Sequence, residues 1–258
     1  MLTAILFGAL SVCGLMFLLW LIHLPLRNAA IVDAGWAGEL ALLGGLYGIL
    51  GAGWAPRRAA TAVMALVWGL RLSLYLLFTR VIGQPEEGRY VQLRRQWRTN
   101  IAFRFLLFFE FQAVLCIVLG VPFLLAAENP RPAFSLLEYA ALVLWVVAIA
   151  GEIAADMQLN AFKSNPANRG KTCRAGLWNY SRHPNYFFEW LIWVCFSLFA
   201  LDSKYGYLAL ISPALMLYFL FKVTGIPATE AQALRTRGEE YRRYQQTTSA
   251  FVPWFPRS

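Results

Sequence analysis

Long apolar runs alternate with short polar segments along the whole chain. Each run approaches the roughly 20 mainly apolar residues that a helix needs to cross a bilayer. The pattern predicts seven membrane-spanning helices, over residues 2–25, 30–53, 59–79, 101–127, 135–162, 184–202 and 205–224. The sequence contains neither an internal repeat nor a linker rich in Pro, Gly or Ser. We therefore expect an all-α, polytopic integral membrane protein with a single domain, residues 1–258.

The charged residues are few and unevenly placed. They make up only 14% of the chain, compared with about 25% in a soluble domain, and the net charge is +9. Arg and Lys collect in residues 80–104, 163–182 and 235–257, which seven spans place on one side. The positive-inside rule makes that side cytoplasmic. We therefore expect an outward N-terminus, a basic amphipathic segment 225–258 on the cytoplasmic face, and a bacterial inner-membrane location.

Several classes of site are not supported by the sequence. The basic residues follow a bilayer pattern rather than a soluble basic surface with interleaved aromatic residues, so a nucleic-acid partner is not expected. Four cysteines without a CxxC pair and only two histidines indicate neither a disulfide framework nor a metal site. The glycines of "GGLYG" at 44–48 lie inside an apolar run, where small residues typically permit close helix packing rather than dinucleotide binding.

Ionisable residues inside a predicted span are the first candidates for a functional site, because charge in a bilayer is expensive. The fifth span ends in "GEIAADMQLNAFKSN". Glu152, Asp156, Asn160 and Lys163 follow one another at spacings of four, four and three, which places them on one helical face. This stripe predicts a ligand site. The alternative is an interfacial stripe of salt bridges at the end of a helix.

The second and third spans carry further polar residues. Trp68, Arg71 and Tyr75 recur at helical spacing, and Arg71 lies roughly 13 Å from the inner end of its span at a helical rise. Asp33 lies near the inner entry of the second span, and Glu39 about 9 Å deeper. Asp33 is either a cofactor contact or an acid at a helix start. Glu39 has few structural uses at that depth beyond pairing with Arg71.

The stretch "GLWNYSRHPNYFFEW", residues 176–190, places polar groups where an apolar run begins. Arg182, Asn185 and Glu189 are spaced so that a helix would align them, and His183 lies at the expected helix start, where free backbone N–H groups favour an anion. The basic residues expected to complete this pocket are Lys163, Lys171 and Arg174. The pattern indicates a phosphorylated or carboxylated cofactor. The alternative is a patch that only binds anionic lipid headgroups.

This stretch carries a family resemblance. Together with "ADMQLNAFKSNPANRGK" before it and "EEYRRYQQTTSAFVPWFP" near the end, it resembles the bacterial membrane proteins related to steroid 5α-reductases, of the 3-oxo-5α-steroid 4-dehydrogenase or DUF1295-like type. The resemblance covers essentially the whole chain and is most specific over 151–190 and 239–256. It implies a seven-helix fold, NADPH bound from the cytoplasmic side, and reduction of a Δ4-3-keto steroid or similar enone lipid. Besides that lipophilic substrate and the membrane lipids, it implies no obligate protein partner.

The resemblance also suggests individual cofactor contacts. The family's Asp, Arg, Arg and Asn fall on Asp156, Lys163, Lys171 and Asn185, and lysine keeps the charge of arginine but loses its bidentate fork. A further cofactor asparagine of the family is Glu152 here. The full set of cofactor-binding residues that we predict is Asp33, Arg71, Asp156, Asn160, Lys163, Lys171, Tyr180, Arg182, His183, Asn185, Tyr186, Glu189, Glu230 and Tyr241.

The catalytic residues implied by the resemblance lie in the second and third spans. The family's acid falls on Glu39 in "WAGEL", with Gly38 in place of a glutamine. Its partner tyrosine falls on Trp68, whose indole donates a hydrogen bond but transfers no proton. Tyr75 is the alternative donor. Deep in a bilayer a carboxyl group favours its neutral form, so we expect Glu39 to donate a hydrogen bond to the substrate carbonyl.

Two other functions remain open. The "RHPNY" element also resembles integral-membrane methyltransferases that bind S-adenosylmethionine, which carry an acid shortly after the last span, as Glu230 is here. A methyltransferase needs no acid midway along the second span, whereas a reductase uses one to polarise a carbonyl, so Glu39 favours the reductase. A non-enzymatic lipid carrier is the third possibility. The symmetric broken helices of inverted-repeat transporters do not appear in the sequence.

Overall fold

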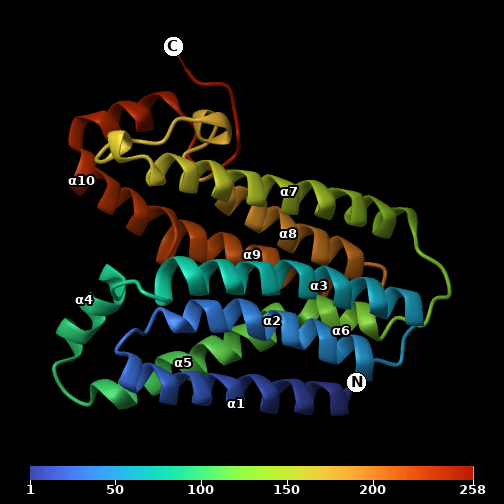
Figure 1. Cartoon of the computed structure of the whole chain (residues 1–258). Helices are drawn as coiled ribbons and strands as arrows, with labels where there is room; N and C mark the ends of the chain where they lie inside the picture. Colours follow the sequence, from blue (N-terminus) through green and yellow to red (C-terminus); the bar gives the residue numbers. More distant parts are fainter. Residues whose placement is uncertain (258) are drawn as a thin grey trace. The chain divides into compact units, whose positions relative to one another are not determined.

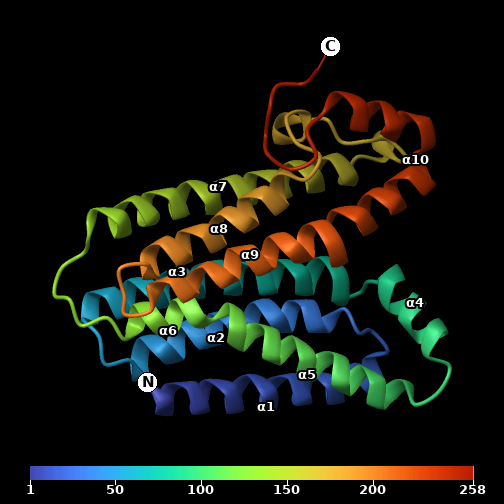
Figure 2. The same cartoon turned by 180° about the vertical axis from the view of Figure 1, so that it is seen from behind.

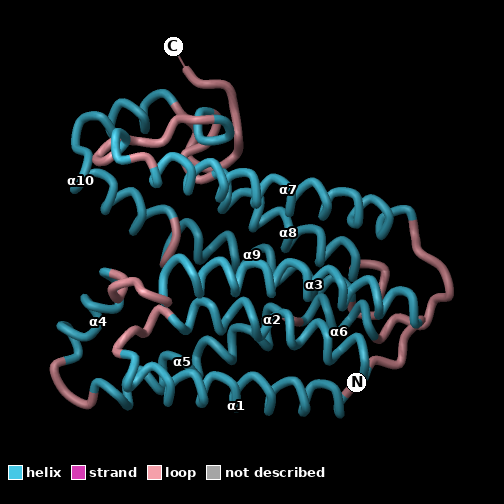
Figure 3. Tube along the Cα trace, in the orientation of Figure 1, coloured by secondary structure: helices cyan, strands magenta, loops and turns pink. Residues whose placement is uncertain are grey.

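The computed structural model describes residues 1–257, and their regular secondary structure is helical. Within these residues no strand forms, and the only β-type pairing is an isolated bridge between Ser181 and Ser249 (Figure 3). The prediction of an all-α fold is confirmed. The chain groups into two compact units, one of residues 1–135 with 200–209 and the other of residues 136–199 with those from 210 onwards. The helices are labelled in Figure 1.

Unit 1 holds the first six α-helices. Their bounds are α1 Leu2–Leu26, α2 Ile31–Leu50, α3 Ala55–Leu76, α4 Gly88–Trp97, α5 Ile101–Leu119 and α6 Val121–Ala127, with a π-helical turn η1 at Leu77–Val81 after α3. The helix α4 lies between the third and fourth predicted spans, where the sequence analysis assigned no helix. The fourth predicted span is also broken, because α5 ends at Leu119 and α6 begins at Val121. Pro122, which lacks an N–H group, lies in the first turn of α6, where no intrahelical partner is needed.

The helices α2 and α3 lie side by side in both views of the molecule (Figures 1 and 2). Small residues bring the two backbones together. A Cβ atom added to Gly69 would lie 2.6 Å from the carbonyl oxygen of Ala37, and one added to Gly48 would lie 2.7 Å from the Cβ of Ala62. The glycines of "GGLYG" therefore serve helix packing, as the sequence predicted.

Unit 2 contains the remaining long helices. Its elements are α7 Leu136–Ser164, η2 Pro166–Asn168, η3 Gly176–Asn179, α8 Pro184–Ala200, α9 Ile211–Tyr218, the π-helical turn η5 Phe219–Val223 and α10 Ile226–Thr247, while the turn η4 Gly206–Leu210 straddles the border of the units. The helix α10 bends at Gly238, whose φ of 53° is strained for residues with a side chain. After α10 the chain returns along the loop before α8, where Trp254 N–H donates to Tyr180 C=O at 2.9 Å.

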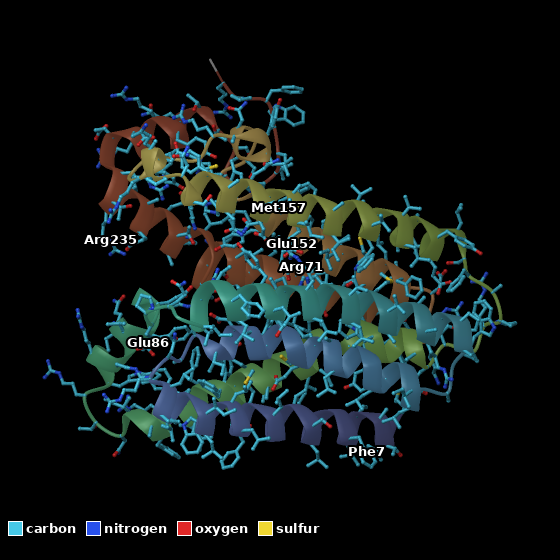
Figure 4. The ribbon with its side chains drawn as sticks, in the orientation of Figure 1. Phe7, Arg71, Glu86, Glu152, Met157 and Arg235 are labelled. Carbon is cyan, nitrogen blue, oxygen red and sulfur yellow. The ribbon has the colours of Figure 1, made fainter. Side chains whose placement is uncertain are left out.

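Five of the described helical stretches are long and apolar enough to cross a membrane. They are Leu2–Leu26, Ala55–Val81, Ile101–Ala127, Leu136–Ser164 and Gly206–Thr247. The apolar part of the last stretch precedes α10, which is rich in Arg and Glu. Exposed apolar side chains such as Phe7 on α1 and Met157 on α7, both labelled in Figure 4, suit contact with lipid tails. These features are compatible with a multi-pass integral membrane protein.

The other two predicted spans are helical but less clearly membrane-spanning. The helix α8 has 17 residues, fewer than the roughly 20 of a typical span. The helix α2 has 20 residues but carries Asp33 and Glu39 within them. Seven crossings, an outward N-terminus and a cytoplasmic C-terminus therefore stay predictions.

Candidate functional site

In unit 2, the polar face of α7 meets the start of α8. Asn185 Nδ2 donates to Asp156 Oδ1 at 3.4 Å, and the Asp156 side chain is buried. One turn earlier on α7, Glu152 is also buried, while Asn160 and Lys163 are exposed further along the helix. The structure thus brings together Asp156 and Asn185, two of the residues that the family resemblance implies for the cofactor.

A partly buried ionic network joins the start of α8 to α10. Arg182 Nε donates to Glu230 Oε1 at 2.6 Å, and its Nη1 donates to the carbonyls of Gln245 and Thr248 at 2.9 and 2.6 Å. His183 Nε2 lies 3.3 Å from the same Glu230 oxygen, and Gln245 Nε2 donates to the other at 2.8 Å. Arg182 and Glu230 are therefore engaged within the protein, where they fix α8, α10 and the following chain to one another.

The pKa of Glu230 reflects this network. Burial alone would raise the pKa of the carboxyl group, but hydrogen bonds from His183 and Arg182, the charge of Arg182 and a hydrogen bond from Gln245 lower it to about 2. Glu230 is therefore ionised at neutral pH. The ionised carboxylate accepts hydrogen bonds from Arg182 and His183 and so holds both side chains in position.

The expected alignment of Arg182 with Asn185 and Glu189 is wrong. The helix α8 begins at Pro184, which needs no N–H partner in a first turn, so Arg182 precedes the helix and turns toward α10. Glu189 instead accepts from Trp193 Nε1 one turn later on α8, at 3.0 Å.

The aromatic members of the predicted set pack around this network. Tyr186 stacks on the His183 ring, with 5.3 Å between ring centroids and 8° between planes, and its hydroxyl lies 3.3 Å from Thr229 Oγ1. Tyr241 is buried on α10, and burial raises its pKa to about 12. Tyr180 is exposed, and its ring meets that of Phe255 edge to face.

A hollow of about 580 Å³ opens beside α10. Its lining residues are Arg174, Glu240, Arg243 and Thr247. The Arg174 guanidinium lies over the Tyr244 ring at 5.1 Å, and the Glu240 carboxylate accepts from the backbone N–H of Thr172 at 2.9 Å. Two guanidinium groups in one open hollow provide charge-assisted hydrogen-bond donors for an anion.

Residues next to this hollow contribute further polar groups. The Thr172 hydroxyl is buried and has no hydrogen-bond partner among residues 1–257. Lys171 is exposed, and Lys163 interacts electrostatically with the buried Cys173 thiol, whose pKa is raised by burial. The sequence analysis missed Glu240, Arg243 and Thr247. The run "EEYRRYQQT" is a signal that could have found them, because α10 presents its charged residues beside the loop at 171–175.

Unit 1 contains the predicted catalytic residues. Glu39 is completely buried on α2, and neither carboxyl oxygen accepts a hydrogen bond of good geometry within the described part of the chain. The buried Cys116 thiol on α5 lies close to the Glu39 carboxyl group. Trp68 is completely buried on α3, with its ring edge-on to that of Trp36 at 6.1 Å between centroids. Arg71 lies over the Tyr75 ring at 5.6 Å. A hydrogen-bonded ion pair from Arg71 to Glu39, the structural alternative, is not formed.

Asp33 has a structural use in unit 1. Its carboxylate accepts from Tyr90 Oη at 2.8 Å and from the Arg89 guanidinium, and it lies 3.9 Å from Arg80 Nη1. Tyr90 is buried, and burial raises the pKa of its hydroxyl well above the ordinary value. Asp33 therefore joins the start of α2 to α4. Its predicted cofactor contact stays a prediction.

A family model described as "Protein of unknown function (DUF1295)" matches residues 19–248. The chain belongs to the DUF1295 family. The match includes every predicted site residue, from Asp33 to Tyr241, and the family is associated with steroid 5α-reductase-like membrane proteins. Neither a curated protein nor a solved structure matches the chain. Family membership is thus confirmed, and the activity is a matter for proposal.

Proposed function

We propose that this DUF1295 protein is a membrane-embedded reductase that uses NADPH to reduce the 4,5 double bond of a 3-keto-Δ4 steroid or a similar enone lipid. The observation that carries the proposal is Glu39. A buried carboxyl group without hydrogen bonds costs stability, and an ionisable group inside a membrane helix is typically functional. A polarised substrate carbonyl is a ligand that would compensate for this cost.

The residues of unit 1 would stabilise developing negative charge. When a double bond conjugated to a carbonyl is reduced, charge builds on the carbonyl oxygen, and hydrogen-bond donors placed there accelerate the reaction. A neutral carboxylic acid in an apolar site is an effective donor, and Glu39 has this role. The indole N–H of Trp68 or the hydroxyl of Tyr75 supplies the second donor. Arg71 holds the Tyr75 ring in place through their contact at 5.6 Å.

The residues of unit 2 fit the phosphates of a dinucleotide. Bound NADPH would supply the hydride. Arg174 and Arg243 line the hollow beside α10, and the Thr172 hydroxyl nearby lacks a hydrogen-bond partner among the residues described. Lys171 adds positive charge in the same loop. The network of Arg182, His183 and Glu230 holds α8 so that Asn185 stays beside Asp156.

A methyltransferase is the second candidate, because the pairing of Arg182 and His183 with Glu230 matches the "RHP" element and following acid of that enzyme class. This function would leave Glu39 without a role. The reductase gives a role both to Glu39 and to the network of Arg182, His183 and Glu230, so we prefer it.

The test is enone-dependent NADPH oxidation by the purified full chain in lipid nanodiscs with a Δ4-3-keto steroid. Glu39→Gln should keep NADPH affinity and lose turnover by about 10²- to 10³-fold, the usual effect of removing one oxyanion donor. Glu128→Gln is the matched control, since Glu128 is a partly buried carboxyl directly after α6 in the same unit, and its turnover should stay near that of the wild type. A folded Glu39→Gln variant with wild-type turnover would exclude Glu39 as the acid.

A further inference from the structure

Four arginines at one end of unit 1 are exposed and unpaired among the residues that the structure describes. Arg27, Arg95, Arg98 and Arg104, which we call the arginine patch, make no side-chain hydrogen bond or ion pair with any described residue. They lie at the end of α1, on and just after α4, and at the start of α5. Figures 1 and 2 both show these three helix ends at the same end of the unit.

Hydrogen bonds hold the segments of the patch together. Trp20 Nε1 on α1 donates to the carbonyl of Ala102 on α5 at 2.8 Å. The Ala29 N–H, just after α1, donates to Glu86 Oε1 at 2.8 Å, and Glu86 is labelled before α4 in Figure 4. The four guanidinium groups therefore project from a fixed framework.

Nearby carboxylates cannot neutralise the patch, because other arginines already pair with them. Glu86 binds Arg94 at 2.9 Å, and Glu87 binds Arg80 and Arg89, each at 3.1 Å. The third carboxylate, Asp33, is also held by the last two arginines. These three carboxylates are thus balanced by three arginines outside the patch. The four arginines of the patch therefore add four positive charges that no neighbouring carboxylate compensates.

At the opposite end of unit 1, the arginines have hydrogen-bond or ion-pair partners within the protein. Arg57 is buried and donates to the carbonyls of Asn129, Arg131 and Ala133 at 3.1, 2.7 and 2.5 Å. Arg58 donates to a backbone carbonyl, and Arg131 lies 3.8 Å from Asp202. The unpaired arginines of the patch are therefore confined to the end of unit 1 that contains α4.

An apolar stripe leads along α5 into the patch. Phe103, Leu107, Phe111 and Val114 recur at helical spacing, and each side chain is 51–55% exposed. Such a stripe suits acyl chains, and Trp97, whose ring meets that of the buried Phe105 on α5 edge to face, is of a type enriched at the interfacial level of a bilayer. Guanidinium groups at the end of an apolar stripe match the chemistry of a phospholipid, with its phosphate next to its chains.

We propose that the arginine patch binds the headgroups of anionic phospholipids, with their acyl chains along the exposed stripe of α5. The site orders anionic lipid around the α4 end of unit 1. It is independent of the proposed reductase activity, and none of its residues belongs to the predicted catalytic or cofactor sets.

The test compares lipid binding by the full chain in neutral detergent, with phosphatidylglycerol or phosphatidylcholine added. Native mass spectrometry counts bound lipids, and thermal unfolding reports stabilisation. The wild type should bind phosphatidylglycerol preferentially and unfold at a higher temperature in its presence. The variant with Arg95→Gln, Arg98→Gln and Arg104→Gln should lose this affinity by at least about ten-fold, since each arginine near an anionic lipid surface contributes about five-fold.

Controls separate the patch from general positive charge. The matched variant removes three exposed arginines of unit 2, Arg169→Gln, Arg235→Gln and Arg242→Gln, and should bind as the wild type does; Arg235 is labelled in Figure 4. A second patch variant, Arg27→Gln with Arg104→Gln, should also lose affinity. Equal binding of both lipids by the wild type, unchanged binding by both patch variants, or equal stabilisation by inorganic phosphate alone would overturn the proposal.

Discussion

At the scale of single residues, the carboxyl groups of Glu230, which is partly exposed, and Glu39, which is buried, differ in their hydrogen bonding. Glu230 receives hydrogen bonds from Arg182, His183 and Gln245, and its pKa is held at about 2. Glu39 is fully buried and accepts no hydrogen bond of good geometry from the described residues. The first arrangement is that of a structural anion that fixes neighbouring segments. The second leaves hydrogen-bonding capacity for a ligand, which is the basis of the reductase proposal.

The pair of Asp156 and Asn185 gives a prediction at the same scale. Asp156→Ala, Asn185→Ala and Lys163→Ala should each weaken NADPH affinity about 10- to 150-fold, because a hydrogen bond to a charged group is worth roughly 1.5–3 kcal/mol. Equilibrium titration of the detergent-purified variants measures the effect. Since Asn185 donates to Asp156, the double variant should lose less than the sum of the two single losses.

The control for this series is Asn179→Ala, since Asn179 is a partly buried asparagine at the end of η3, before α8. It should leave affinity unchanged. Wild-type affinity in all three test variants would place the cofactor elsewhere.

At the scale of elements, most helices could be predicted from the sequence. Apolar runs of about 20 residues are a strong signal, so each of the seven predicted spans is helical in the structure. The short helix α4 was missed because its ten residues are polar and follow the turn signals of "IGQPEEGRY". The orientation of Arg182 was also missed. Its side chain turns toward α10 rather than lining up with Asn185, because it pairs with Glu230, 48 residues later in the sequence.

The candidate site was predictable only in part for the same reason. Helical spacing and the family resemblance were enough to name Asp156 and Asn185 as site residues. The hollow beside α10 was not predictable in this way, because it forms where a loop packs against a helix distant in sequence. Glu240 meets the Thr172 N–H across 68 residues of sequence. Such contacts are set by tertiary packing, which spacing within one element does not encode.

The tie between α8 and α10 predicts a pH dependence of stability. The pKa of Glu230 is lowered from an ordinary 4.5 to about 2 in the folded protein. Its contribution to the free energy of unfolding is therefore fully present above about pH 4.5 and is lost as the pH falls toward 2. Thermal unfolding in detergent should show Glu230→Gln less stable than the wild type at neutral pH, with a difference that narrows over this acidic range.

The control for the pH series is Glu239→Gln on the same helix, because Glu239 is exposed and pairs with the exposed Arg242, three residues on. Its stability should follow the wild type at all pH values. A Glu230→Gln variant as stable as the wild type at neutral pH would contradict the anchoring role.

At the scale of the whole molecule, the open question is the path of the chain through the membrane. Seven crossings would place residues 80–100, 163–182 and 225–258 on the cytoplasmic side, with residue 1 opposite, by the positive-inside rule. Single cysteines introduced into a chain without its four native cysteines can be labelled from either side of sealed vesicles. Residues 95 and 170 should react from the cytoplasmic side, and residue 130 only from the other. Labelling of residues 130 and 170 from the same side would rule out the seven-span path.

The most direct test of the central claim is equilibrium binding of nucleotide cofactors to the detergent-purified full chain, with NADPH and S-adenosylmethionine titrated separately. The reductase proposal predicts saturable NADPH binding that Asn185→Ala weakens and Asn179→Ala does not, with no saturable binding of S-adenosylmethionine. Saturable binding of S-adenosylmethionine alone would contradict the proposal and favour the methyltransferase.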